Sequence, residues 1–283
     1  MRRQNKQLFP ARIVWSLILI WSCIAASPVA SASPQAAPKT GKREILKQAI
    51  QSQYSLRRLG LVELKVNVLP NWELMAKKPD PNPEALKMLN GLIYSLSLKP
   101  DGSVKVEHQA SVPIPGNQEE NVRKISGGME QMLSGFFATW NFFMFNSPFP
   151  DVESEYQLQE ADGKYLLTYN EGETSVSTTM TKEFAILQVE VSSQTFKASI
   201  KPQQLKTPKG YILMGYQGTF DPATGPGKTS LDLQLDYQEV SGLQLPRKLK
   251  LDAISDGVPA QLELQFSQYH VELADSGLPR KSN

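Results

Sequence analysis

Hydrophobic residues recur at steps of three and four between residues 121 and 150, in the most aromatic stretch of the chain. That spacing lays one apolar stripe along a helix, with polar residues mostly on the opposite side. Asn121 is placed to cap the start, and Pro148 and Pro150 end the helix because proline lacks the amide donor. The stripe consists of Val122, Ile125, Met129, Met132, Leu133, Phe136, Phe137, Trp140, Phe143 and Met144.

Beyond residue 150 the period changes from helical to alternating. Leu231, Leu233 and Leu235, for example, alternate with Asp232 and Gln234, which is typical of a strand with one buried face. Nine strands are predicted here, over 156–160, 165–169, 176–180, 185–192, 195–201, 211–220, 231–237, 249–253 and 260–273. Turn residues separate many of them, at Asp162-Gly163, Glu171-Gly172, Lys209-Gly210, Gly225-Pro226-Gly227, Ser241-Gly242 and Asp256-Gly257.

Earlier segments complete the predicted fold. An amphipathic helix over 42–59 leads into a strand over 61–69, which residues 71–78 continue beyond Pro70. A proline-rich loop, 79–83, precedes a short helix over 83–90 and a hairpin of strands 92–98 and 104–110. The predicted class is mainly β (α+β): a large curled antiparallel sheet, an unclosed barrel, covered by a few helices.

The N-terminus has the pattern of an export signal. Basic residues come first, an apolar run over 13–26 follows, and small residues at 30–32 predict cleavage between Ala32 and Ser33. The predicted organisation is a signal peptide (1–32), a flexible linker (33–41), a single domain (42–275) and a loose tail (276–283). Cys23 leaves open a lipid anchor as the alternative to cleavage.

Charge and cysteine content narrow the location and the partners. The four basic residues of segment 1–32 account for the formal charge of +2, because the remaining chain has 26 basic and 28 acidic residues. Nucleic acid is therefore not an expected partner. Cys23 is the only cysteine, so a chain cut after Ala32 has none. An exported protein of this size without disulfides suits a bacterial periplasm.

The sequence contains no pattern that predicts catalysis. The only histidines, His108 and His270, lie on separate predicted strands, without the spacing of a zinc site. A serine nucleophile elbow is absent, and Pro226 interrupts the one glycine-rich stretch that resembles a phosphate loop. We therefore expect no enzyme activity, no metal and no cofactor.

The aromatic stripe is the candidate binding site. Methionine and aromatic side chains adapt to flexible apolar ligands, and residues 142–145 are apolar on every face of the helix. The alternative is that the stripe only fills the core, as amphipathic helices usually do. The predicted lining residues are Met129, Met132, Leu133, Phe136, Phe137, Trp140, Phe143 and Met144.

The C-terminal hairpins resemble a known family. A strand ends in Tyr237-Gln238-Glu239-Val240-Ser241-Gly242, Leu245-Pro246 follows, and the chain closes with a strand through Gln265-Phe266-Ser267-Gln268-Tyr269. These segments are similar to the closing hairpins of the LolA-like periplasmic lipoprotein carriers and their LolB and LppX relatives. The resemblance implies an unclosed barrel covered by helices, with an apolar cavity for acyl chains and no catalysis.

Three functions follow as hypotheses. The first is a periplasmic carrier or binder of lipid or lipoprotein acyl chains. The second is a cell-envelope interaction or sensor module with the same fold and a filled core. Its partner would be another protein, and membrane proteins of the envelope are candidates. The third is an unrecognised hydrolase. A hollow of roughly 300 Å³ or more between helix and sheet favours the carrier.

Overall fold

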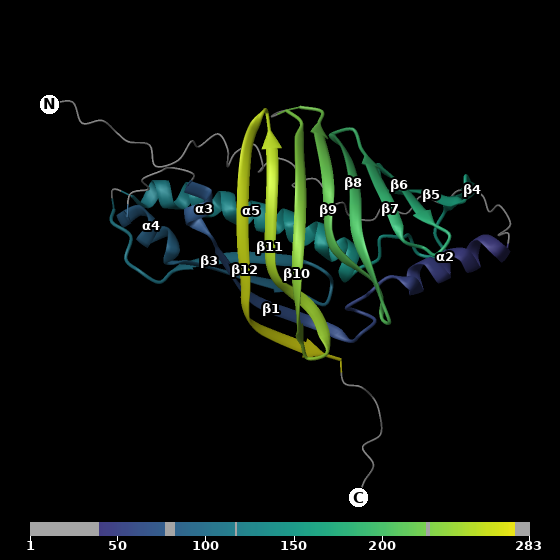
Figure 1. The fold of residues 1–283 in the computed structure, drawn as a ribbon, viewed down its shortest axis with the longest axis horizontal. Helices are drawn as coiled ribbons and strands as arrows, with labels where there is room; N and C mark the ends of the chain where they lie inside the picture. Colours follow the sequence, from purple (N-terminus) through teal and green to yellow (C-terminus); the bar gives the residue numbers. More distant parts are fainter. Residues whose placement is uncertain (1–39, 77–82, 117, 225–226, 275–283) are drawn as a thin grey trace, which may run out of the picture.

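The computed structural model describes residues 40–76, 83–116, 118–224 and 227–274. The predicted fold class is confirmed: one twelve-stranded antiparallel sheet, not closed into a barrel, is accompanied by a few helices (Figure 1). The strand order is β3-β2-β1-β12-β11-β10-β9-β8-β7-β6-β5-β4. The described helices are α2 (Thr40–Ser52), α3 (Trp72–Ala76), α4 (Pro83–Asn90) and α5 (Glu119–Met144).

The strands follow the alternating pattern of the sequence closely. The first three are β1 (Leu61–Pro70), β2 (Leu92–Leu98) and β3 (Val104–Ala110). The nine predicted after residue 150 are confirmed as β4 (Tyr156–Ala161), β5 (Lys164–Glu171), β6 (Thr174–Thr181), β7 (Ile186–Ser192), β8 (Phe196–Thr207), β9 (Gly210–Pro222), β10 (Thr229–Val240), β11 (Leu243–Ser255) and β12 (Val258–Leu273). Several tight turns have a glycine with positive φ, as at Gly163 and Gly242.

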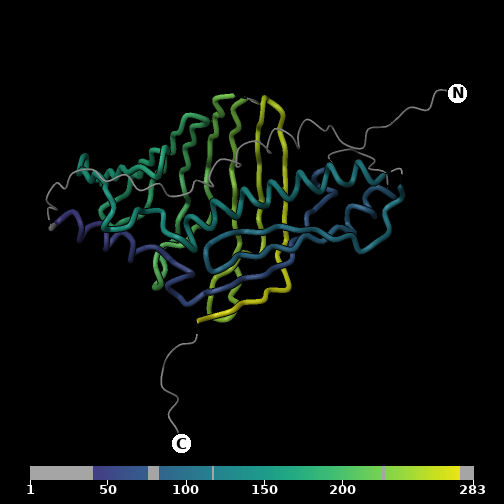
Figure 2. Tube along the Cα trace, turned by 180° about the vertical axis from the view of Figure 1, so that it is seen from behind, coloured from purple at the N-terminus to yellow at the C-terminus, as the bar shows by residue number. Residues whose placement is uncertain are grey.

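Strand β12 joins the two parts of the sheet. It pairs with β11 through residues 258–265 and with β1 through residues 264–273, for example at Val68 opposite Phe266 and Leu64 opposite Val271. Its pairing with β1 is irregular at two points, and Gln268 has a φ of 54°. Figures 1 and 2 show β12 bending and then running beside β1. Strands β1–β3 therefore lie at an angle to β9–β12, and the bend creates a hollow side.

Helix α5 lies on this hollow side. It runs along β3 and crosses the strands from β9 to β12 (Figure 2). Its end is fixed by two hydrogen bonds: Asn141 Nδ2 donates to the Gly102 carbonyl at 2.8 Å, and the Leu56 amide donates to the Met144 carbonyl at 2.7 Å. The prediction of Asn121 as the N-cap was wrong, because the helix starts at Glu119 and Gln118 occupies the cap without a side-chain bond.

Helix α2 is shorter than predicted and ends at Ser52. The next residues turn toward the sheet, where Gln53 forms a bridge with Tyr211 and the Tyr54 amide donates to the Tyr211 carbonyl. Arg58 Nη1 donates to the Ile50 carbonyl at 3.1 Å, which satisfies an acceptor in the last helical turn. Docking onto β9 thus overrides the helical period that continues to residue 59.

Residues 72–76 also differ from the prediction. They form helix α3 instead of continuing β1, because Asn71 Oδ1 accepts a hydrogen bond from the Leu74 amide at 3.2 Å. An asparagine after a proline break is a helix cap, and this signal outweighs the weak alternation that follows it.

Several predictions lie outside the described residues. These are the signal peptide with Cys23, Ala32 and Ser33, most of the linker, the loop over 79–82, the turn at Gly225-Pro226 and the tail over 276–283. Among the residues that are described, no helix combines the length and the apolar character needed to cross a bilayer.

Candidate functional site

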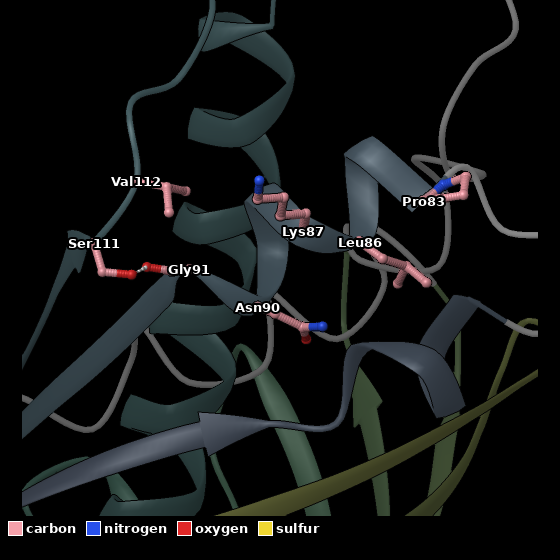
Figure 3. Close-up of a pocket in the computed structure, with 7 residues that line it drawn as sticks. All are labelled: Pro83, Leu86, Lys87, Asn90, Gly91, Ser111 and Val112. Carbon is pink, nitrogen blue, oxygen red and sulfur yellow. Dashed lines mark hydrogen bonds between the residues drawn. The ribbon is translucent and has the colours of Figure 1, made fainter.

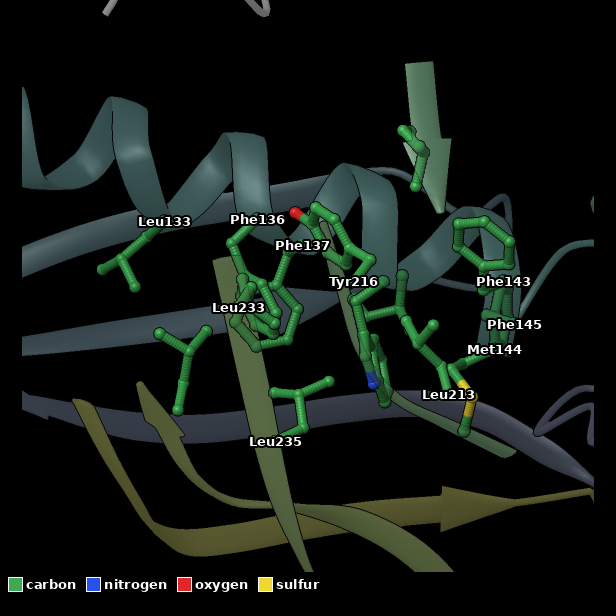
Figure 4. Packing of buried hydrophobic residues seen from close by; sticks show 14 of the residues in the cluster. Leu133, Phe136, Phe137, Phe143, Met144, Phe145, Leu213, Tyr216, Leu233 and Leu235 are labelled. Atoms are coloured by element: carbon green, nitrogen blue, oxygen red, sulfur yellow. The ribbon is translucent and has the colours of Figure 1, made fainter. Parts of the chain in front are cut away.

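The predicted lining residues all belong to α5 and lie together in the core. Seven are buried, and Met132 is half-buried and packs against the same cluster. Figure 4 shows several of them directed toward side chains from the sheet, among them Leu213, Tyr216, Leu233 and Leu235. The sequence therefore identified the buried face of the helix. Whether that face binds a ligand depends on the space beside it.

The C-terminal half of α5, residues 133–144, is packed closely against the sheet. The Phe266 ring of β12 lies 6.2 Å from the Phe136 ring and 5.9 Å from the Phe137 ring, centroid to centroid. Trp140 has no exposed surface, and its Nε1 donates to the Tyr237 hydroxyl at 3.2 Å. These contacts place the helix itself in the hollow of the sheet.

Tyrosine hydroxyls complete this contact. Tyr237 donates onward to the Leu213 carbonyl, so Trp140, Tyr237 and Leu213 form one hydrogen-bonded chain. Burial raises the pKa of Tyr237, and the hydrogen bond from Trp140 only partly opposes that rise. Burial also raises the pKa of Tyr216 to about 12. Both phenols therefore remain neutral near pH 7, and they act as hydrogen-bonding groups within an apolar layer.

A cation fixes the end of α5. The Arg57 guanidinium lies 4.6 Å from the centre of the Phe145 ring and donates to the Pro100 carbonyl at 3.2 Å and to Asn146 Oδ1 at 3.4 Å. The end of the helix, the β2–β3 turn and the segment before β1 meet at this side chain. The sequence shows two adjacent arginines, and only the structure distinguishes Arg57 here from Arg58, which holds the end of α2.

The N-terminal half of α5, residues 119–132, is attached through a more polar contact. His108 Nδ1 of β3 lies 2.7 Å from Glu130 Oε1, and the His108 ring lies 5.8 Å from the buried Tyr94 ring. Tyr94 lies in turn 6.4 Å from Trp72 of α3. Burial, followed by the nearby Glu130 carboxylate, raises the pKa of Tyr94.

Two donors in this cluster have no hydrogen-bond partner among the described residues. They are the Tyr94 hydroxyl and Trp72 Nε1, and both side chains are almost fully buried. Sequence reasoning missed this cluster, because its members come from α3, β2, β3 and α5. It predicted no metal-binding or catalytic role for His108, and the structure places the ring of this residue against Glu130 of α5. The other histidine, His270, is exposed on β12.

Two open depressions on the surface are lined by residues outside α5. One, of about 480 Å³, lies between α4 and the end of β3, beside Leu86, Gly91 and Val112 (Figure 3). The other, of about 660 Å³, is a groove on the outer face of the sheet, across the strands from β7 to β12. Between the C-terminal half of α5 and the sheet lie closely packed side chains, among them Phe136, Phe137 and Phe266.

Neither a metal site among the described residues nor a similarity to known proteins assigns a function to this part of the structure. Within the described ranges no three histidine, cysteine, aspartate or glutamate side chains are placed to hold a metal ion. No family model, curated protein or solved structure matches this chain.

Proposed function

We propose that this chain is a non-enzymatic interaction module of the cell envelope, whose curled sheet is filled by its own helix. The observation that carries the proposal is the burial of the C-terminal half of α5. Leu133, Trp140 and Met144 have no exposed surface. The envelope location rests on the export pattern of residues 1–32, which is a sequence inference.

The free energy of burying apolar side chains favours this function over a carrier in which α5 leaves the hollow of the sheet to admit a ligand. Burial of one large apolar side chain stabilises a protein by about 1.5–3 kcal/mol, so six such side chains contribute on the order of 10–20 kcal/mol. The six in the C-terminal half are Leu133, Phe136, Phe137, Trp140, Phe143 and Met144. A whole domain is stable by only about 5–15 kcal/mol. A ligand that displaced this half would therefore have to replace nearly all of its contacts.

The acyl-chain binder is the second candidate, and the N-terminal half of α5 is the observation that favours it. Among its apolar residues only Val122 and Met129 are buried, and the unpaired donors of Tyr94 and Trp72 lie beneath this part of the molecule. A chain of methylene groups entering there would displace far less apolar contact than at the C-terminal half. An ester carbonyl would be a suitable acceptor for either donor.

Native mass spectrometry distinguishes the two functions. The chain is produced with its own N-terminus in a bacterial host that exports it, and organic extraction of the purified protein recovers any lipid. We expect the mass of the protein alone and less than one-tenth of an equivalent of acyl lipid. One equivalent of lipid would contradict the interaction module and support the carrier.

A matched pair of variants locates any lipid that is found. Met132→Glu places a charge on the half-buried face of the N-terminal half, and Gln131→Glu places the same charge on its exposed face. If lipid lies beneath this half, the first variant loses it and the second retains it. Equal retention by the two variants would place the lipid elsewhere and remove the reason for the second candidate.

A further inference from the structure

The groove on the outer face of the sheet is built from a row of polar side chains. The pairing registers place five residues opposite one another in sequence across β8, β9, β10, β11 and β12, which lie side by side (Figure 1). They are Lys201, Gln217, Asp232, Asp252 and Gln261, and all five line the groove. Because neighbouring strands lie about 4.8 Å apart, the row extends for about 19 Å.

A second row, two residues further along each strand, forms the floor. Ser199, Thr219 and Ser230 stand opposite one another on β8, β9 and β10, and Ile254 and Pro259 continue the row on β11 and β12. Small hydroxyl side chains beside long polar ones produce a groove that runs across the strands. Its volume of about 660 Å³ lies within the usual range for ligand sites.

Hydrogen bonds from neighbouring side-chain amides orient the two carboxylates in the row. Gln217 Nε2 donates to Asp232 Oδ2 at 3.1 Å, and Gln261 Nε2 donates to Asp252 Oδ1 at 2.8 Å. Asp232 and Asp252 are direct partners across two strands, where like charges are unfavourable. Neither belongs to an ion pair among the described residues, and Asp232 Oδ1 is shielded from solvent without a partner there. The fold alone gives no reason for this pair.

The chemistry of the groove identifies the ligand class. Two carboxylates repel a polyanion, and the floor combines the hydroxyl groups of Ser199, Thr219 and Ser230 with the apolar side chains of Ile254 and Pro259, so it suits a ligand that presents both polar groups and apolar surface. A docked protein surface is usually anchored by aromatic or arginine side chains in a desolvated pocket, and none of the described lining residues is aromatic. The carboxylates and amides of the first row and the hydroxyls of the second together accept and donate hydrogen bonds, which suits neighbouring hydroxyl groups.

We propose that this groove binds a neutral glycan chain, laid across the strands with its hydroxyl groups on Asp232 and Asp252. The amides of Gln217 and Gln261 bind on either side, and Ser199, Thr219 and Ser230 contact one face of the sugar rings. This site is independent of the hollow filled by α5, so it does not depend on whether the core also binds lipid. It gives the outer face of the module a ligand of defined chemistry.

Calorimetric titration of the purified chain tests the proposal. The probes are neutral β-linked N-acetylglucosamine, cellulose-type and starch-type oligosaccharides, each from the disaccharide to the hexasaccharide. We expect at least one series to bind, with an affinity that rises with length because longer chains reach more of the row. Absence of binding by all three series at millimolar concentration would overturn the proposal, and so would binding of an oligolysine peptide alone.

Three variants separate ligand binding from a structural role. Asp252→Asn should weaken glycan binding about tenfold to a hundredfold, the loss expected for a hydrogen bond to a charged group. Its urea midpoint should stay equal or rise, because the like-charge pair is removed. Gln261→Ala should also weaken binding, whereas Gln265→Ala, on the same strand and four residues away, should leave it unchanged. Equal loss in Gln261→Ala and Gln265→Ala, or an unchanged affinity in Asp252→Asn, would overturn the assignment.

Discussion

The two halves of α5 belong to one continuous apolar stripe and are nevertheless held in different ways. The C-terminal half is surrounded by Phe266, Tyr237 and Tyr216 and by the turn at Gly102. The N-terminal half lies along an edge strand, where β3 is mostly exposed and His108 Nδ1 contacts Glu130 Oε1 of the helix at 2.7 Å. The periodicity of a helix therefore identifies which side is buried, and the layer opposite decides how firmly it is held.

The largest effect is expected at the centre of the firmly held half. Trp140→Ala removes a fully buried indole and its hydrogen bond to Tyr237, so the free energy of unfolding should fall by about 3–5 kcal/mol. Urea denaturation followed by far-ultraviolet circular dichroism measures this change. Phe142→Ala, at a half-buried neighbour, should cost about 1 kcal/mol or less. Equal losses in the two variants would show that the half is not packed as described.

The two halves can be compared directly by truncating one buried methionine in each. Met144 and Met129 are both buried, one in each half, and truncation of such residues costs about 2–5 kcal/mol. We expect Met144→Ala near the upper end of this range, because its surroundings are enclosed and cannot collapse into the space. Met129→Ala should fall near the lower end, because the N-terminal half can shift toward β3. The reverse order in urea denaturation would contradict the comparison.

The turn that fixes the end of α5 should show an intermediate effect. Gly102 has a φ of +84°, and an added Cβ would lie 3.2 Å from Asn146 Oδ1 and 3.6 Å from Asn141 Nδ2. Gly102→Ala should therefore lower the free energy of unfolding by about 1–2 kcal/mol for the backbone, and further through displacement of Asn146. Gly163→Ala is the control, because its φ of +70° is similar and its surroundings are open. Thermal denaturation should show the larger loss at Gly102.

The smallest effect is expected at the polar attachment of the N-terminal half. Glu130→Gln weakens the contact with His108, where both side chains are about one-third exposed, so the global free energy should change by less than about 1 kcal/mol. Hydrogen exchange should nevertheless become faster in residues 119–132 and remain unchanged in residues 133–144. Glu120→Gln, which removes only the exposed pair with Lys124 within the helix, should leave both rates nearly unchanged. Faster exchange in both halves would show that α5 moves as one unit.

Most elements of the fold follow from local patterns in the sequence. Alternation and turn residues predict the hairpin of β2 and β3 and the nine strands after residue 150, because each depends on neighbouring residues only. The errors at residues 53–59 and 72–76 arise where a tertiary contact or a cap overrides a weak period. The third error, Asn121 as the cap of α5, concerns only the exact start of that helix. The neighbour relation between β1 and β12 joins segments about two hundred residues apart, and no local signal contains it.

The candidate sites show the same limit. The pattern of α5 selects the correct side chains, but whether they line a hollow or fill it depends on the curvature of the sheet, which Gln268 and the irregular pairing of β12 help to determine. The row in the outer groove is even less visible in sequence. Lys201 and Gln261 are sixty residues apart, and a shift of one residue in any register would direct the side chain of that strand to the other face.

The pairing of β1 with β12 has a consequence for how the molecule forms. The first strand finds its long-range neighbour only when β12 is available, so the chain must emerge through residue 273 before β1, β2 and β3 can join the rest of the sheet. Contacts between residues so distant in sequence make folding slow, because much chain entropy is lost before the pairing stabilises it. Such a delay would suit the export that the pattern of residues 1–32 predicts, because a chain that crosses a membrane unfolded must not fold before it has crossed.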